Sequence, residues 1–304
     1  MKKANLFTGI SLGTVQWGMP YGIANKTGQP NMGEILKILS LASSVGINTL
    51  DTARSYGTSE SIIGSATRQK NFDFRVITKL SPNIYSKNLS NDEILFNTKQ
   101  SINESLIQLK VHTLDTVLIH RGYHRNVNDG VIWKLLRSLK ESGLIRKIGV
   151  SAVNPSEALE ALYDSSIDVL QIASSLMDRR LLSRNFFEEA ANRGIEVHLR
   201  SVFLQGVAHL DVSDIPKSLG ALIPEILKIK SAAKQMEVEP IDLWINHVLG
   251  LKVSNIILGV DNENQLITNI KRIGNLIEKP LYFDLTELAE LPDQFLDPSM
   301  WAHR

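Results

Sequence analysis

The sequence contains no cysteine among its 304 residues, and this absence removes several classes of chemistry. Without cysteine there is no disulfide framework, no thiolate-bound zinc or iron–sulfur cluster and no thiol nucleophile. A chain of this length buries about three quarters of the surface that its unfolded form exposes, so its core needs neither disulfide nor structural metal. Cysteine chemistry is therefore excluded, and we also expect no metal site.

An excess of charge of either sign is also missing, and so is a long apolar run. The 33 Lys and Arg residues nearly balance the 32 Asp and Glu residues, so nucleic acid, which needs a basic surface, is not an expected partner. No stretch approaches the roughly 18 consecutive apolar residues that span a bilayer. The two lysines near the start precede no apolar segment typical of secretion. We expect a cytoplasmic protein without a membrane partner, as a monomer or weak homo-oligomer.

Short apolar runs rich in Val, Ile and Leu recur along the chain, separated by segments with helical periodicity. Such runs are typical of strands buried on both faces, as in a parallel sheet that helices cover. The eight runs span residues 10–15, 47–51, 76–79, 116–120, 147–151, 169–173, 196–200 and 256–259. They predict an α/β fold with eight parallel strands.

Helix start signals stand between these runs. Asn31 and Ser90 each precede a glutamate by three residues, and Asn154 precedes a proline, patterns that indicate helix caps. No linker rich in Pro, Gly or Ser and no charge block divides the chain. We therefore predict a (β/α)8 TIM barrel that forms a single domain over residues 1–304.

The alternative fold is a doubly wound open sheet. Its dinucleotide site requires a G-x-G-x-x-G turn between the first strand and the first helix. The sequence lacks this turn, because Gly9 and Gly13 have the wrong spacing and precede no helix. The missing glycine-rich turn favours the barrel.

Ionisable side chains end three consecutive predicted strands, where a barrel places its catalytic groups. These are Asp51, Lys79 and His120, and Tyr56 follows Asp51 by five residues. Each alone has an ordinary explanation: an Asp caps a turn, a Lys extends to solvent, and a His or Tyr forms a hydrogen bond in the core. Four such residues in this order are difficult to attribute to chance, so we predict one site.

Carbonyl reduction is the chemistry that suits these four groups. A phenol, with an ordinary pKa of about 10, donates a proton at neutral pH when a nearby ammonium stabilises the phenolate. Lys79 supplies this ammonium to Tyr56, and Asp51 offsets the cost of burying it. His120, neutral or protonated, donates a hydrogen bond that orients the carbonyl oxygen.

At these residues the sequence resembles the aldo-keto reductases. Residues 51–64, DTARSYGTSESIIG, are similar to the family signature D-T-A-x-x-Y-G with its following S-E and Gly, and Lys79 and His120 stand where the family has its catalytic Lys and His. The resemblance extends over residues 9–270. It implies a (β/α)8 barrel that binds NADP(H) or NAD(H) without a Rossmann domain, with Tyr56 as general acid and hydride from the nicotinamide C4.

The resemblance also implies a cofactor site. Its residues are Ser151, Gln171, Arg200, Gly259, Asp261, Gln265 and Asn269. Ser151 and Gln171 correspond to ligands of the nicotinamide carboxamide, but Ala152 stands where the family has an Asn, unless Asn154 compensates. Residues 200–206 resemble the loop over the pyrophosphate, with Arg200 alternatively a surface cation or a substrate contact. Residues 257–269 resemble the adenosine-binding segment.

Asp261 bears on the choice between the two cofactors. Members that prefer NADPH often place Lys, Ser or Arg in this segment to bind the 2′-phosphate, whereas a carboxylate repels a phosphate and accepts a hydrogen bond from a ribose hydroxyl. Asp261 therefore predicts a weakened preference for NADPH; the alternative is that it only caps the next helix.

Aromatic and cationic residues near the strand ends are candidates for the substrate pocket. Trp17 and Tyr85 are expected to line it, although Trp17 alternatively plugs the barrel mouth. Arg54 and Arg121, close to Tyr56 and His120, favour an anionic or hydroxylated substrate.

We interpret the sequence as an NAD(P)H-dependent reductase of a small-molecule aldehyde, ketone or sugar-like carbonyl. One alternative is a cofactor-binding regulatory protein on the same barrel, similar to the potassium-channel β-subunits. Another is a Schiff-base aldolase that uses Lys79, since barrel lysines perform that chemistry.

Overall fold

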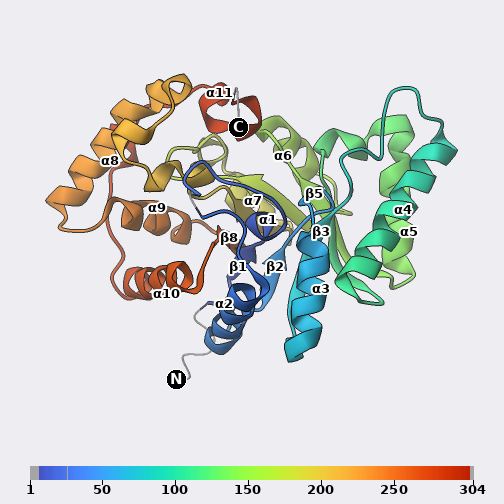
Figure 1. The fold of residues 1–304 in the computed structure, drawn as a ribbon. Helices are drawn as coiled ribbons and strands as arrows, with labels where there is room; N and C mark the ends of the chain where they lie inside the picture. The colour runs from blue at the N-terminus through green and yellow to red at the C-terminus, as the bar shows by residue number, and fades with distance from the viewer. Residues whose placement is uncertain (1–6, 26, 302–304) are drawn as a thin grey trace.

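The computed structural model describes residues 7–25 and 27–301. Within them, eight parallel strands pair in chain order and close into a barrel (Figure 1). The strands are β1 (Ile10–Gly13), β2 (Thr49–Asp51), β3 (Arg75–Lys79), β4 (Leu114–Ile119), β5 (Ile145–Ser151), β6 (Val169–Ala173), β7 (Glu196–Arg200) and β8 (Asn255–Gly259). The predicted (β/α)8 barrel is confirmed, with β6 and β7 at their predicted bounds. The first six residues, Lys26 and the last three lie outside the described residues.

Helices connect the strands and cover the barrel. They are α1 (Val15–Gly18), α2 (Met32–Val45), α3 (Ser59–Lys70), α4 (Asn91–Leu109), α5 (Val131–Glu141), α6 (Pro155–Leu162), α7 (Phe186–Asn192), α8 (Ile223–Gln235), α9 (Pro240–Leu249), α10 (Glu263–Glu278) and α11 (Asp293–Leu296). Short 3₁₀ helices stand in the loops, among them η2 (Gly122–Arg125), η5 (Leu204–His209) and η9 (Pro298–Met300). In the part of the chain that the structure describes, no helix is long and apolar enough to cross a membrane.

The predicted caps start three of these helices. The side chains of Asn31, Ser90 and Asn154 each accept a hydrogen bond from the backbone N–H three residues later. Ser90 forms a full capping box with Glu93, whose carboxylate accepts from the Ser90 N–H at 2.8 Å. These caps satisfy backbone donors that a helix leaves without partners.

The apolar core lies in two places, as barrel geometry requires. Most buried apolar side chains lie between the strands and the surrounding helices. A small second cluster of Ile77, Leu118 and Val169 fills the inside of the barrel. A Cβ at Gly149 would lie 2.0 Å from the Val169 carbonyl oxygen, so this close approach of β5 and β6 requires glycine. Above this layer the inward positions become polar.

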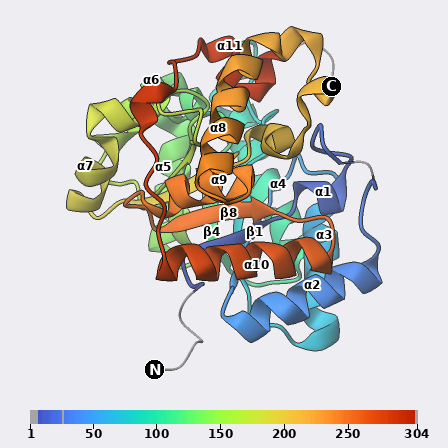
Figure 2. The ribbon, with the colours of Figure 1, turned by 90° about the vertical axis from the view of Figure 1, so that its left-hand side faces the viewer.

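Two segments from outside the strand–helix repeat cover the C-terminal ends of the strands. Residues 19–31, between α1 and α2, cross to the loop after β7, where the Ile23 N–H donates to the Gln205 carbonyl at 3.2 Å. Arg180 forms an ion pair with Asp293 of α11 at 3.0 Å and thereby holds the C-terminal segment over the barrel. Figure 2 shows α10 beside α2, where the Glu263 N–H donates to a carboxylate of α2.

Candidate active site

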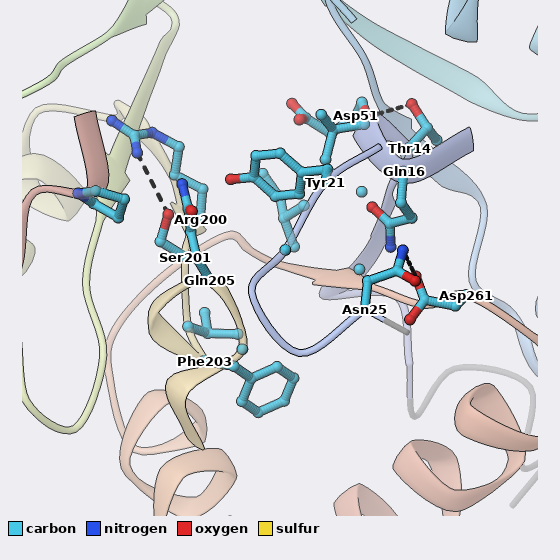
Figure 3. Close-up of a pocket in the computed structure, with 18 of the residues that line it drawn as sticks. Thr14, Gln16, Tyr21, Asn25, Asp51, Arg200, Ser201, Phe203, Gln205 and Asp261 are labelled. Atoms are coloured by element: carbon cyan, nitrogen blue, oxygen red, sulfur yellow. Dashed lines mark hydrogen bonds between the residues drawn. The ribbon is translucent and has the colours of Figure 1, made fainter. Parts of the chain in front are cut away.

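A cavity of about 830 Å³ lies at the C-terminal ends of the strands. This volume is near the upper end of the range of about 300–1,000 Å³ for small-molecule pockets. Its wall extends from Tyr56 and His120 to Asp261 at the start of the α10 segment. Figure 3 shows Arg200 on one side of the cavity and Asp261, beside Asn25, on the other.

A buried ion pair stands at the inner end of the cavity. The fully buried Lys79 ammonium donates to both Asp51 carboxylate oxygens, at 2.9 and 2.8 Å, and to the Thr52 carbonyl at 2.8 Å. Burial opposes the charge, but Asp51 and the neighbouring Tyr56 outweigh it and raise the pKa of Lys79 above its ordinary value. Lys79 is therefore a fixed positive charge whose three donors are all engaged.

Tyr56 lies beside this charge on a tightly held loop. The Lys79 ammonium is 4.9 Å from the centroid of the half-buried Tyr56 ring. Below the loop, the Ser59 hydroxyl bonds to Thr14 at 2.7 Å, and Gly18 approaches so closely that a Cβ there would lie 1.9 Å from the Tyr56 carbonyl oxygen. Packing on both sides fixes the backbone that carries the phenol.

His120 faces the Tyr56 ring from the end of β4. The ring centroids are 6.1 Å apart and the planes meet at 87°. Burial, reinforced by the positive charges of Lys79, Arg200 and Arg121, lowers the pKa of His120 to about 3. Of the two protonation states that the sequence left open, the structure thus favours the neutral ring. The Ser55 hydroxyl lies 3.3 Å from Nδ1, which leaves Nε2 for another partner.

The two arginines that the sequence placed near the site differ in their surroundings. Arg54 does not line the cavity, and it forms an ion pair with Glu60 at 2.5 Å and a second one with Glu104. Arg54 therefore does not fit the expectation of a substrate contact. Arg121 lies on the cavity wall.

Ser151 and Gln171 lie together beside the ion pair. The Ser151 hydroxyl donates to Gln171 Oε1 at 3.3 Å, and Gln171 Nε2 donates to Asp51 Oδ1 at 2.6 Å. Ser151 lines the cavity, whereas the fully buried Gln171 is behind the wall. The predicted amide ligand thus also orients the Asp51 carboxylate.

Ala152 stands where the family has a second amide side chain, and its backbone carbonyl is bonded by Arg200. Arg200 Nη2 donates to the Ala152 carbonyl at 2.8 Å, and Arg200 lines the cavity. Asn154 accepts from the Glu157 N–H at 2.9 Å, which caps α6, and it is not part of the wall. Asn154 therefore does not replace the missing amide.

The far end of the cavity contains the other predicted cofactor residues. These are Gly259, Asp261, Gln265 and Asn269. Asn262, not Asp261, caps α10, because its side chain accepts from the Gln265 N–H at 2.9 Å. The Asp261 carboxylate accepts instead from Asn25 at 3.4 Å and from Gln265 Nε2 at 3.2 Å, and burial raises its pKa. The carboxylate is therefore available on the wall.

Two loops contribute further wall residues: the loop after β7, which the sequence indicated through its resemblance over residues 200–206, and the loop between α1 and α2, which it did not indicate. In the loop after β7, Ser201 (φ 58°), Gln205 (φ 52°) and Gly206 (φ 99°) all have left-handed backbone. Such strain at non-glycine residues concentrates at functional sites. From the loop of residues 19–31, Tyr21 and Asn25 line the wall. For this second loop, the one available signal of a functional role was its length, since loops that reach or exceed about 12–15 residues without secondary structure are uncommon and are usually functional.

The two predicted aromatic pocket residues do not line the cavity. Trp17 is fully buried, and its indole N–H donates to the Val260 carbonyl at 3.4 Å, so the interpretation of Trp17 as a pocket residue was wrong. Tyr85 packs edge-to-face against His124, with ring centroids 5.5 Å apart, and is likewise outside the wall. Both side chains support the barrel instead.

The cavity fits an extended dinucleotide better than a metal-centred group. At Gly259 a Cβ would lie 2.7 Å from Gln16 Nε2, so the missing side chain keeps this part of the wall open. Carboxylate, amide and hydroxyl groups line the remainder. Among residues 7–25 and 27–301, no group of three or more His, Asp or Glu side chains is arranged to hold a metal ion. The donor set matches the polar groups of a nicotinamide dinucleotide.

Comparison with known proteins identifies a matching family, two relatives by sequence and a similar solved structure. The family model described as the Aldo/keto reductase family matches residues 9–280. The chain is 29% identical over 250 residues to the oxidoreductase YqkF of Bacillus subtilis (strain 168), covering 78% of this chain and 81% of that protein. It is 26% identical over 183 residues to the NADH-specific methylglyoxal reductase of Escherichia coli (strain K12), covering 53% of this chain and 54% of that protein. Among solved structures, the aldo-keto reductase AKR11C1 from Bacillus halodurans in its holo form superposes with a TM-score of 0.69 at 21% identity, over 92% of this chain and 89% of that chain.

Proposed function

Because this chain belongs to the aldo/keto reductase family, we propose that it is an NAD(P)H-dependent carbonyl reductase in which Tyr56 is the general acid. The observation that carries this proposal is the Tyr56 ring next to the Lys79 ammonium, with Asp51 paired to that ammonium. Proton donor, stabilising charge and counter-ion meet at one end of a cavity large enough for cofactor and substrate. We propose that residues 1–304 act as one domain.

The four groups have distinct tasks. A nicotinamide bound in the cavity would supply the hydride. His120, neutral at physiological pH, donates one ring N–H to the substrate carbonyl oxygen and orients it. Tyr56 transfers its hydroxyl proton to that oxygen, and the Lys79 ammonium stabilises the phenolate that remains. Asp51 holds the ammonium in place.

The chain also offers candidate contacts along the length of the cofactor, although the second amide at position 152 is missing. Ser151 would hold the nicotinamide carboxamide, with Gln171 supporting its hydroxyl from behind the wall, and Asp261 would face the adenosine ribose. Residues 201–206, with left-handed backbone at Ser201, Gln205 and Gly206, would lie against the pyrophosphate, because successive turns of this kind present backbone N–H groups to anions. Gly259, Gln265 and Asn269 would form the adenosine end.

Tyr56→Phe tests the general-acid role. We expect kcat for a reduced carbonyl to fall by about 10²- to 10⁴-fold, the usual contribution of general acid catalysis. The dissociation constant for NADH, from cofactor fluorescence titration, is expected to stay within about twofold. Tyr163→Phe, at an exposed tyrosine remote from the cavity, is the matched control. A kcat close to that of the wild type would refute the role.

Asp261 supports a preference for NADH. Its carboxylate is on the wall rather than in a helix cap, and one curated relative is named as NADH-specific. Repulsion of a 2′-phosphate near a protein surface is worth roughly 1 kcal/mol or more, so Asp261→Asn should raise kcat/KM for NADPH by about five- to tenfold. Asp73→Asn, at an exposed position, is the control. A wild-type enzyme that strongly prefers NADPH would contradict this preference.

The two other functions make different predictions. A Schiff-base aldolase requires a neutral amine, and the raised pKa of Lys79 keeps it protonated, which argues against that chemistry. Trapping by borohydride at Lys79 without nicotinamide would favour the aldolase. Tight cofactor binding without reduction of any carbonyl in a broad panel would favour the regulatory protein.

A further inference from the structure

Two guanidinium groups on the cavity wall have no carboxylate partner among the residues that the structure describes. Arg121 is exposed on the wall and forms no ion pair with any residue that the structure describes. Arg200 is half-buried, and within the described part of the chain its guanidinium donates to neutral acceptors, the Ala152 carbonyl at 2.8 Å and, at 3.5 Å, the Ser201 hydroxyl. Both side chains line the cavity without an ion pair to a residue of 7–25 or 27–301.

Other cations around this end of the barrel are neutralised. Arg54 is paired with Glu60 and Glu104. Arg272, which lies on the same cavity wall, is paired with Asp242 at 2.6 Å. The lack of a carboxylate partner is therefore a property of Arg121 and Arg200, not of arginines in this region generally.

Both unpaired charges belong to the reaction end of the cavity. Arg121 directly follows His120, and Arg200 lies across the cavity from Asp261 (Figure 3). Of the wall carboxylates, Asp51 is neutralised by Lys79. An anion at this end would thus meet positive charge from two strand ends.

We propose that Arg121 and Arg200 form an oxyanion subsite, and that the substrate is an aldehyde or ketone that carries a carboxylate or phosphate group. Guanidinium groups present planar, paired donors that match both oxyanions, and a cleft lined by one sign of charge concentrates ligands of the other sign. The proposal rests on the proposed reductase function and adds the charge of its substrate. It also explains why Arg54, although next to the site in sequence, has no such role.

Matched substrate pairs test the proposal. Succinic semialdehyde is compared with butanal, and glycolaldehyde phosphate with glycolaldehyde, in NADH-dependent reduction. We expect kcat/KM to be at least tenfold higher for the charged member of one pair, and the pair that shows it distinguishes carboxylate from phosphate. In Arg121→Gln the ratio of kcat/KM for the charged member to kcat/KM for the neutral member should fall by about 10- to 100-fold, the effect of losing a charge-assisted hydrogen bond. Arg137→Gln, an exposed arginine on α5, should leave the ratio unchanged.

Arg200→Gln separates a substrate contact from a cofactor contact. A fall in the charged-to-neutral ratio with an unchanged dissociation constant for NADH supports the subsite. Weaker NADH binding with an unchanged ratio assigns Arg200 to the cofactor and overturns the two-arginine subsite.

The remaining outcomes separate this proposal from the proposed function. Equal kcat/KM within each pair overturns the oxyanion subsite and leaves the reductase intact. If no carbonyl is reduced with either cofactor, the reductase proposal fails, and calorimetric titration with succinate and with inorganic phosphate decides the subsite. Binding of either anion that weakens at least tenfold in Arg121→Gln supports it, and no binding overturns it.

Discussion

Replacing Lys79 by methionine should strongly destabilise the protein, because it leaves a carboxylate buried without its counter-ion. Lys79 is 0% exposed and Asp51 is 4% exposed, so water can replace little of the contact that the two groups make with each other. The substitution keeps the length and most of the volume of the side chain. Its effect therefore reports on charge and hydrogen bonding more than on packing.

The magnitude follows from the contacts that are lost. Lys79→Met removes two hydrogen bonds to Asp51 and one to the Thr52 carbonyl. Loss of one partner of a buried ion pair costs about 3–5 kcal/mol. Gln171 Nε2 still donates to Asp51 at 2.6 Å, so we expect the lower part of this range, about 3–4 kcal/mol.

Reversible urea unfolding measures this cost. The buried Trp17 and Trp244 give a fluorescence signal, and far-UV circular dichroism gives a second one; coincident transitions are required before a two-state free energy is derived. Lys99→Met, at an exposed position of α4, should change the free energy of unfolding by less than about 0.5 kcal/mol.

A double-mutant cycle gives the decisive comparison. Asp51→Asn combined with Lys79→Met removes both charges, so the double variant should be more stable than Lys79→Met alone by at least about 1.5 kcal/mol. If the two single effects add, or if Lys79→Met unfolds within about 1 kcal/mol of the wild type, the buried pair is not the source of stability argued above.

Further tests concern His120 and the backbone under Tyr56. The pKa of His120 is about 3 in the folded protein and near 6.5 in the unfolded chain, so its contribution to stability is complete above pH 6.5 and is lost as the pH falls toward 3, at up to about 1.4 kcal/mol per unit. His120→Gln should therefore lose stability less steeply over this range than the wild type or the exposed His112→Gln control, and parallel slopes in urea unfolding would contradict this. Gly18→Ala should lower kcat about 100-fold by displacing the Tyr56 loop, because a Cβ at Gly18 would lie 1.9 Å from the Tyr56 carbonyl oxygen. Gly274→Ala, where nothing lies within 4 Å, should keep its kcat, and equal rates for the two glycine variants would refute the argument.

The strands and the four central groups could be predicted from the sequence for one physical reason. Strands buried on both faces must be apolar along their length, so a polar residue that ends such a run is conspicuous. Asp51 and Lys79 each end a run, and a closed barrel brings the ends of neighbouring strands together. Their contact required no information beyond the chain order.

The pocket residues required information that local patterns do not contain. The run of residues 10–15 was predicted as one strand, but β1 ends at Gly13, and the Thr14 hydroxyl donates to the Asp51 carbonyl at 2.8 Å. The chain then turns into α1, a helix of four residues that directs Trp17 into the core. A helix this short leaves no periodic signal, so the sequence could not show that Trp17 faces away from the cavity.

The same limit applies to charge, and Arg54 and Arg121 show it directly. Each is close in sequence to a catalytic candidate, so the sequence gives them equal weight as substrate contacts. Arg54 is neutralised by Glu60 and by Glu104, a residue of α4 that lies 50 positions away in the chain. Arg121 has no such partner in residues 7–25 and 27–301. Whether a cation is available to a ligand is thus set by tertiary neighbours, and for this barrel that difference makes the charge of the substrate a testable property.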